Sequence, residues 1–438
     1  MSGLRELGLD FVAEGNWEKA LACFAESVRR QANDHRSRML AARCYAKLGE
    51  NERAVTVLHA CAEGLLRRDY LLSGIAACRQ ALPLAPREKR IRETLARIHA
   101  RAARIVGGKA SVPPPLPPES LYDGQVTSDL MTLTGSELSD TAISVLASPD
   151  TGGHADPEAR PPLPLFAELE REAFVELVEL LDYRELQDGD AICTEGEGGD
   201  RIYVLVAGKA EVSRRVEGQE KRLAFLGGGS IFGEMSLLTG SAPTSTVRAV
   251  GDADVLEIER KDLNELARNY PSVPQVLATF AQTRMARNII ATSPLFTPVP
   301  EAERSDLLSR FTFRGLQPGE KIIKEGEPVG ALVLVLAGEV VVQKEDPGGG
   351  VVSLGVLREG EVAGEIALLK GLRATATVAA TRKTAVATLD RAAFEGLLKQ
   401  HPGLRDYLDG LSDRRLKQIG EAMRPIEVLD ADELVVES

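Results

Sequence analysis

The sequence predicts a multidomain α+β protein, in which an all-α helical repeat is followed by two β-rolls of the jelly-roll type, each flanked by helices. Its 438 residues are enough for two to four domains at roughly 100 to 200 residues each. Apolar residues recur every three or four positions through residues 1–105, and no proline occurs before Pro83, which is typical of helices. Two later stretches repeat each other and contain Val-, Ile- and Leu-rich runs broken by glycine turns, which indicate strands.

The helical region, residues 1–105, contains a self-similarity of 34 residues. Residues 7–24 recur as residues 41–58, with small residues where helices would approach each other and a glycine at each turn, Gly15 and Gly49. A third, degenerate unit would end near Pro86, followed by a basic helix that caps the array. The spacing resembles the tetratricopeptide repeat, which implies protein binding. A plain helical bundle is the alternative.

Charge is distributed unevenly. The chain has a formal net charge of −12, but residues 1–105 hold 19 Lys and Arg against 12 Asp and Glu, so this part is +7 and the remainder is −19. Seven basic residues crowd residues 87–104. This helix would dock an acidic partner or the chain's own acidic domains, unless it is simply a solvated face.

Residues 106–162 are predicted to be a linker. They contain nine prolines and eight acidic residues against two basic ones, a composition that buries too little apolar surface to offset the entropy of ordering. Residues 121–146 differ, because apolar residues alternate there with acids and hydroxyls. This island is either a simple spacer or a segment that folds on a partner or is phosphorylated.

A duplication within the chain is shown by the constant difference between the residue numbers of matching motifs. Gly189 and Gly208 return as Gly319 and Gly338, an offset of 130, and FGEMSLLTG at 232–240 returns as AGEIALLKG at 363–371, an offset of 131. Equivalent segments at a constant spacing over more than 100 residues indicate two copies of one domain. Inside each copy, the GE dipeptide is expected to open a short helical turn whose first amides suit a phosphate.

These motifs, in the same order in both copies, resemble the cyclic-nucleotide-binding domain. The resemblance implies domains at 163–292 and 293–422, followed by an acidic tail at 423–438. It also implies that Gly233 and Gly364 let the backbone approach a ligand and that Glu234 and Glu365 bind the ribose 2′-hydroxyl. Alternatively, the two glutamates only cap local amides.

The arginine that pairs with the cyclic phosphate in this family is missing, since Pro243 and Ala374 occupy its position. Arg373 stands one residue earlier and would have to swing onto the phosphate, which favours the second copy as the ligand site. Thr244 and Thr375 stand where a hydroxyl contacts guanine in some family members, which favours cGMP over cAMP, unless they are ordinary strand residues. No cofactor is certain, and the expected ligand is a cyclic nucleotide.

The expected function is that of a cytoplasmic signalling adaptor. A nucleotide bound in a weakened phosphate site would move the helices that follow each roll and change which protein partner the helical repeat and linker hold. The alternative is a nucleotide-independent scaffold with degenerate rolls.

Other functions find no support in the sequence. We expect no enzyme, because phosphate-loop, hydrolase, kinase and metal-ligand motifs are absent. We expect no nucleic acid partner, because the charge is negative and the residues after the last predicted helix are acidic. No apolar run is long enough to span a membrane, and no secretory signal precedes the first helix. The tandem rolls also resemble the regulatory subunit of cAMP-dependent protein kinase, but the linker lacks an RRxS-like inhibitor sequence.

Overall fold

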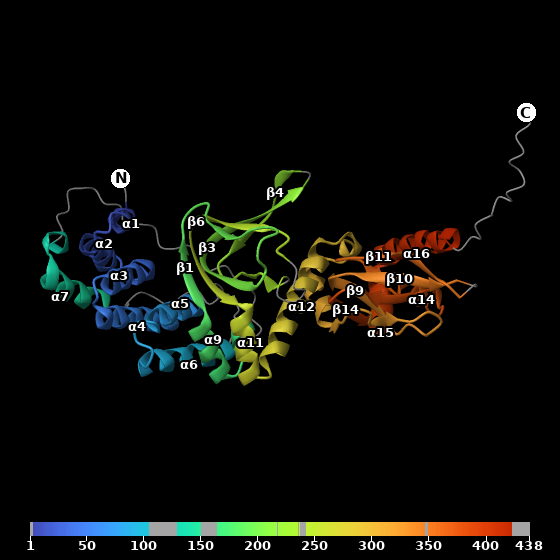
Figure 1. Cartoon of the computed structure of the whole chain (residues 1–438), viewed down its shortest axis with the longest axis horizontal. Coiled ribbons are helices and arrows are strands. Elements are labelled where there is room, and N and C mark those ends of the chain that lie inside the picture. The colour runs from blue at the N-terminus through green and yellow to red at the C-terminus, as the bar shows by residue number, and fades with distance from the viewer. Residues whose placement is uncertain are drawn as a thin grey trace, which may run out of the picture. The chain divides into compact units, whose positions relative to one another are not determined.

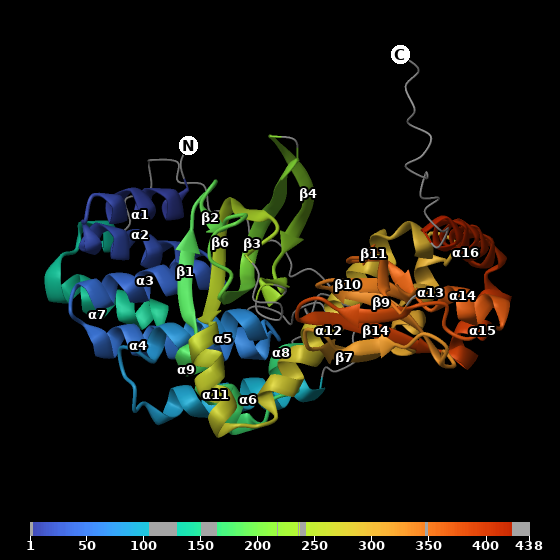
Figure 2. The same ribbon diagram turned by 45° about the vertical axis from the view of Figure 1, so that its right-hand side comes forward.

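The chain folds as two compact units, residues 1–277 and residues 278–438. The computed structural model describes residues 3–104, 129–149, 164–216, 218–234, 236, 242–346 and 349–422. The first unit contains the helical array and the first roll, and the second unit contains the second roll (Figures 1 and 2). Helices therefore come first and β-sheet domains with flanking helices follow, which confirms the predicted α+β architecture.

Six helices open the chain, and each packs on the next. A methyl group added at Gly8 would lie 2.5 Å from Cε1 of Phe24, so the close approach of the first two helices requires glycine. Gly15, with φ of +73°, lies at the turn between the two helices of the first pair. Gly49, 34 residues later and with φ of +83°, lies at the turn between the two helices of the second pair. The basic helix that the sequence assigned to a cap is the second helix of a third pair. The helices are α1 (Leu4–Ala13), α2 (Trp17–Arg30), α3 (His35–Lys47), α4 (Asn51–Arg67), α5 (Leu71–Ala81) and α6 (Lys89–Arg104).

Part of the expected linker is an ordered element of the fold. Residues 129–149 form η1 (Asp129–Thr132) and α7 (Gly135–Leu146), which pack on α2 and, over a smaller area, on α4. Leu138 and Leu146 are almost completely buried there. The interpretation of residues 121–146 as a simple spacer is therefore wrong for residues 129–146, which fold onto the chain itself. The rest of the expected linker, residues 105–128 and 150–163, lies outside the described residues.

The first roll is a six-stranded antiparallel sheet with the order β1-β6-β3-β4, on which β2 pairs with β6 and β5 with β3. Inward-facing aliphatic residues such as Leu205, Ala253 and Val255 form its core and are fully buried. Its elements are α8 (Pro164–Ala167), α9 (Arg171–Leu180), β1 (Asp182–Leu186), β2 (Ala191–Cys193), β3 (Arg201–Val216), β4 (Gln219–Gly227), β5 (Ile231–Phe232), β6 (Thr246–Glu259), α11 (Arg260–Asn269) and α12 (Val273–Thr292).

The helical array and the first roll share a buried polar contact. The Arg36 guanidinium of α3 lies 3.5 Å from the Asp254 carboxylate of β6, and both side chains are less than a tenth exposed. Burial raises the pKa of Asp254 to about 6, although Arg36 opposes the shift. Burial likewise raises the pKa of Tyr183 well above its usual value. A separate ion pair joins the array to the helix before the first sheet, where Arg92 of α6 pairs with Glu179 of α9 at 2.7 Å. The basic region therefore does face an acidic part of its own chain.

Two further arginines of the basic helix are used inside the array. Arg97 donates to both carboxylate oxygens of Glu63, at 2.7 and 2.8 Å, and Arg101 donates to Asp69 at 2.6 and 2.9 Å. The Arg101–Asp69 pair is bidentate, Arg97 uses Nη1 for both contacts, and the two pairs join α6 to the preceding helix pairs. Arg97 and Arg101 thus already have acidic partners within the chain.

The second roll consists of two four-stranded antiparallel sheets with the orders β11-β10-β13-β8 and β12-β9-β14-β7. Its elements are η2 (Pro294–Phe296), α13 (Glu301–Ser309), β7 (Thr312–Leu316), β8 (Lys321–Ile323), β9 (Ala331–Ala337), β10 (Val340–Glu345), β11 (Val351–Leu357), β12 (Val362–Ala363), α14 (Glu365–Lys370), β13 (Thr377–Ala380), β14 (Thr384–Asp390), α15 (Arg391–Gln400) and α16 (Pro402–Ala422).

The two rolls repeat individual hydrogen bonds at the offset read from the sequence. The Glu195 amide donates to Oγ1 of Thr246 at 3.0 Å, and the Glu325 amide donates to Oγ1 of Thr377 at 3.1 Å. The donors are 130 residues apart and the acceptors 131, as the sequence predicts for a single inserted residue. Separately, none of the described helices is long and apolar enough to cross a membrane.

Candidate functional site

A short helix in the second roll forms the floor of the candidate site. Strand β12 ends at Ala363, Gly364 reverses the chain with φ of +87°, and α14 begins at Glu365. A Cβ at Gly364 would lie 3.0 Å from Val329 Cγ1 and 3.1 Å from the Ala331 carbonyl oxygen. Glycine is therefore required both by the left-handed backbone and by the space available. The first-turn amides of α14 have no acceptor within the helix and are available at its N-terminal end.

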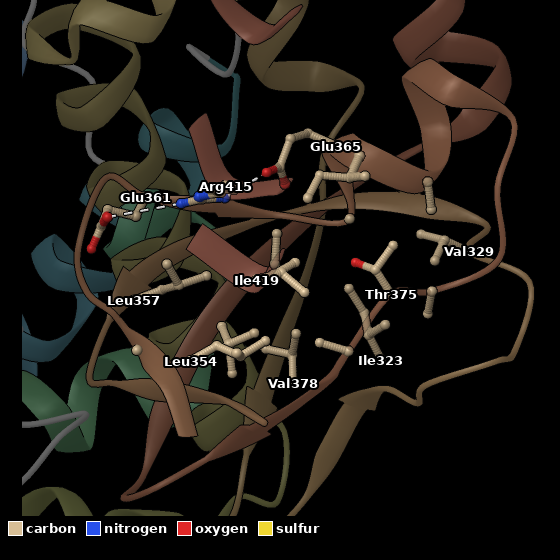
Figure 3. Close-up of a pocket in the computed structure, with 18 of the residues that line it drawn as sticks. Ile323, Val329, Leu354, Leu357, Glu361, Glu365, Thr375, Val378, Arg415 and Ile419 are labelled. Carbon is tan, nitrogen blue, oxygen red and sulfur yellow. Dashed lines mark hydrogen bonds and ion pairs between the residues drawn. The ribbon is translucent and has the colours of Figure 1, made fainter. Parts of the chain in front are cut away.

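A cavity of about 240 Å³ lies above this floor (Figure 3). Its volume is just below the range of roughly 300 to 1,000 Å³ typical of small-molecule sites. Most of the lining is aliphatic and comes from the sheet β11-β10-β13-β8, from the segment between β8 and β9 and from α16: Ile323, Val329, Val342, Leu354, Val356, Leu357, Val378 and Ile419.

The polar part of the cavity centres on Glu365, which is 1% exposed. The Arg415 guanidinium of α16 donates through Nη1 to Glu365 Oε1 at 2.6 Å and to the Val362 carbonyl oxygen at 2.6 Å. Its Nη2 lies 3.9 Å from Oε1 of Glu361 (Figure 3). Among the described lining residues, Arg415 is the one that carries a positive charge. It neutralises a buried carboxylate, which would be costly if left alone, and ties α16 to the floor of the roll.

Ala374 and Thr375 form one wall of the cavity. Ala374 is 7% exposed, and two backbone hydrogen bonds fix it: its amide donates to the Glu327 carbonyl oxygen and its own carbonyl accepts from the Gly326 amide, both at 2.9 Å. Thr375 is half-buried, and its carbonyl oxygen accepts from Lys344 Nζ at 3.0 Å.

Lys344 also forms an ion pair with Glu325, behind the same wall. Burial alone would raise the pKa of Glu325, but hydrogen bonds from Lys344 Nζ and from the Glu345 amide hold it below its usual value. The wall beside Thr375 is thus braced by an ionised pair and not by packing alone.

The structure does not bring Arg373 into the cavity. Its side chain is exposed, and its Nη1 donates to the Gly326 carbonyl oxygen at 2.9 Å, while its backbone bridges to Pro328. To reach a phosphate above α14, Arg373 would have to give up that hydrogen bond. Of the predicted residues in the second copy, Gly364, Glu365 and Thr375 line the cavity together, and Arg373 does not.

The corresponding region of the first roll also has a glycine with positive φ directly before the candidate glutamate. Gly233 has φ of +89°, and a Cβ there would lie 2.4 Å from the Arg201 carbonyl oxygen, so glycine is again required. Glu234 is buried at 7% exposure. Thr244 is exposed, and its carbonyl oxygen accepts from Arg214 Nε at 2.8 Å. Residues 235 and 237–241, which would complete this site, lie outside the described residues.

Arg415 is the charged lining residue that sequence reasoning missed. It is 50 residues from Glu365 and belongs to no local motif. From the sequence, the helices after each roll are expected to move when a nucleotide binds, and α16 contributes Arg415, Gln418 and Ile419 to the lining. Charge alone does not show which of the several basic residues of that helix turns inward.

Comparisons with known proteins agree with the duplicated motif. Residues 183–270 and 313–401 each match the family model of the cyclic nucleotide-binding domain. A cAMP-dependent protein kinase regulatory subunit of Yarrowia lipolytica is 30% identical over 234 residues, which cover 53% of this chain and 58% of the relative. A cGMP-dependent protein kinase of Eimeria tenella is 27% identical over 230 residues, which cover 52% of this chain and 21% of the relative.

The chain thus spans little more than half the length of the first of these relatives and about a fifth of the second. Among solved structures, the regulatory domain of Toxoplasma gondii PKA, crystallised with cAMP, is 22% identical. The match covers 57% of this chain and 92% of that one, with a TM-score of 0.29.

Proposed function

Because the chain carries two cyclic nucleotide-binding domains in tandem, we propose that it is a non-enzymatic regulatory adaptor whose second roll takes a cyclic nucleotide. The observation that carries this proposal is the cavity above α14, where a buried carboxylate meets an aliphatic wall. The ribose 2′-hydroxyl would donate to Glu365, and the base would occupy the aliphatic part. Relatives named as regulatory subunits support a regulatory role, and the kinase relative is matched over only about a fifth of its length.

The response to ligand would pass through Arg415. Its guanidinium already binds Oε1 of the Glu365 carboxylate, to which a ribose hydroxyl would also donate, and the cavity is small for a nucleotide. Ligand entry would therefore weaken the attachment of α16 to the roll. This coupling requires that the ligand bind the chain with α16 released more tightly than the chain with α16 attached.

The adaptor would act by binding a protein partner on its helical array. Its three helix pairs and the 34-residue spacing of Gly15 and Gly49 support a tetratricopeptide-like array, a type of fold that binds proteins. The array and the first roll belong to one compact unit, so a partner held there would be carried by the same body as the first cyclic nucleotide-binding domain.

A second candidate function is a nucleotide-independent scaffold. It is favoured by Pro243 and Ala374, which replace the phosphate-binding arginine in both copies. A charge-assisted pair of that kind contributes about 1.5 to 3 kcal/mol, so its loss weakens affinity roughly tenfold to 150-fold. The two candidates differ in one measurable property, which is whether any cyclic nucleotide stabilises the chain.

Thermal unfolding with cAMP and with cGMP at millimolar concentration tests the proposal. A ligand at 100 times its dissociation constant stabilises the folded chain by about 2.7 kcal/mol. We expect stabilisation of the native chain, its loss in Glu365→Ala, and its retention in the matched control Glu234→Ala. No stabilisation by either nucleotide would reject the switch in favour of the scaffold. Hydrogen exchange of α16 then tests the coupling: it should rise with ligand and should already be high without ligand in Arg415→Ala.

A further inference from the structure

Residues 129–149 lie on the helical array in the way that a bound helix lies on a receptor. In Figures 1 and 2, α7 runs beside the first helices of the array. Leu138, Ala142 and Leu146, spaced by four residues, form one face of α7 and are at most 1% exposed. Leu130 of η1 is also fully buried. The segment therefore presents a single apolar stripe to α2 and α4.

The array contributes polar donors that meet the backbone of this segment. Tyr45 Oη of α3 donates to the Ser139 carbonyl oxygen at 2.8 Å. Arg38, which is 1% exposed, donates to the carbonyl oxygens of Leu146 and of Ser148, the latter at 2.9 Å. A cation at the C-terminal end of a helix complements its dipole and its unpaired carbonyls. These contacts recognise a helix and its end, whatever side chains it carries.

Charge adds a second level of recognition. Residues 129–149 contain three acidic residues and no Lys or Arg. Arg29 of α2 pairs with Asp129 at 2.6 Å, and Arg53 of α4 pairs with Asp140 at 2.6 Å. The two ion pairs lie at the start and in the middle of the segment, and together they set its direction on the array.

The segment has little reason to be helical by itself. Helix α7 has 12 residues, GSELSDTAISVL, of which seven are Gly, Ser, Thr, Ile or Val, and isolated helices of that length are marginal in water even with good helix formers. Its helix therefore depends on docking, as in segments that fold on a partner. Residues 105–128 and 150–163 tether it to α6 and α8.

We propose that the face formed by α2, α3 and α4 is a binding surface for an acidic amphipathic helix, and that residues 129–149 occupy this surface in cis. A partner helix with the same apolar stripe and acidic residues at the same positions displaces them. This inference deepens the partner-binding half of the proposed function and rests on it, but it does not depend on nucleotide binding.

Fluorescence anisotropy tests the inference with the full chain and a labelled peptide of residues 129–149, without nucleotide. Leu138→Glu together with Leu146→Glu in the chain should release the segment and leave the receptor face intact. We expect this double variant to bind the peptide at least tenfold more tightly than the native chain does. Ser136→Glu, an exposed position on the same helix, is the matched control and should behave like the native chain.

A charge exchange tests the surface itself. Arg53→Glu, added to the released double variant, should weaken peptide binding, and a peptide with Asp140→Arg should restore it. Equal peptide binding by the native and released chains would overturn the inference. So would absence of binding to a released chain whose array is folded, as judged by the fluorescence of Trp17. Either failure leaves the Glu365-dependent response to nucleotide untouched, so the two proposals fail separately.

Discussion

Restoring the missing cation at Ala374 should strengthen cyclic nucleotide binding. Ala374 lines the cavity, and its backbone is fixed by two hydrogen bonds of 2.9 Å, so a longer side chain extends from a rigid point. An arginine there would extend into the cavity that Glu365 of α14 also lines, where the cyclic phosphate would be placed. A charge-assisted pair contributes about 1.5 to 3 kcal/mol, which corresponds to roughly tenfold to 150-fold in affinity. We expect the lower end of this range, because the new guanidinium also pairs with Glu365 in the free chain.

Isothermal titration with cAMP and cGMP measures this gain in Ala374→Arg. Two control variants separate charge from shape: Ala374→Gln adds length without charge, and Arg373→Ala removes a cation that lies outside the cavity. Neither should change affinity by more than about twofold. A neutral nucleoside should gain nothing from the arginine, because it has no phosphate. An equal gain for the nucleoside, or no gain for either cyclic nucleotide in a chain with native thermal unfolding, would refute the assignment of Ala374 to the phosphate site.

Two further predictions concern the base and the contact between the array and the first roll. Thr375→Ala should lower the affinity for cGMP relative to cAMP by several-fold in competition titrations, and an unchanged ratio would show that the hydroxyl does not contact the base. The raised pKa of Asp254, about 6 against 3.8, means that its contribution to stability is fully present below pH 3.8 and is lost as the pH rises through 6. The unfolding free energy of the native chain, followed by Trp17 fluorescence, should therefore fall by about 2 kcal/mol relative to Asp254→Asn between pH 4 and pH 7. A difference that stays constant with pH would contradict this.

The duplicated rolls were predictable because their constraints are local. A glycine with positive φ before a short helix, such as Gly364, is demanded by the backbone and appears at the same offset in both copies. The helical pairs were predictable for the same reason, since apolar periodicity and turn glycines act over a few residues.

The contacts that sequence reasoning missed join distant segments. Arg415 reaches Glu365 across 50 residues, and Arg97 and Arg101 satisfy Glu63 and Asp69 within the array, where we had considered an acidic partner. A basic helix has the same composition whether its charges face another protein or its own fold. Only the geometry of the folded chain distinguishes the two cases.

Composition was also misleading for residues 129–149. Their hydroxyl- and acid-rich sequence resembles a spacer, yet Leu130 and Leu138 are buried against the array. The composition of the whole stretch 106–162 favoured a linker, although the apolar residues within 121–146 set that part of it apart. The apolar stripe of α7 spans only two turns, which is too short for periodicity alone to outweigh the surrounding prolines.

The thiol of Cys23, in the helical array, lies next to the segment η1 that packs on the array. Its Sγ lies 3.9 Å from Sδ of Met131 in η1, and burial raises the pKa of the thiol to about 12. Alkylating and oxidising reagents attack the thiolate, so a sulfur kept protonated and out of water is inert. As long as η1 stays packed on the array, Cys23 does not react with such reagents. The rate at which the Cys23 thiol is modified therefore measures whether η1 is docked or released.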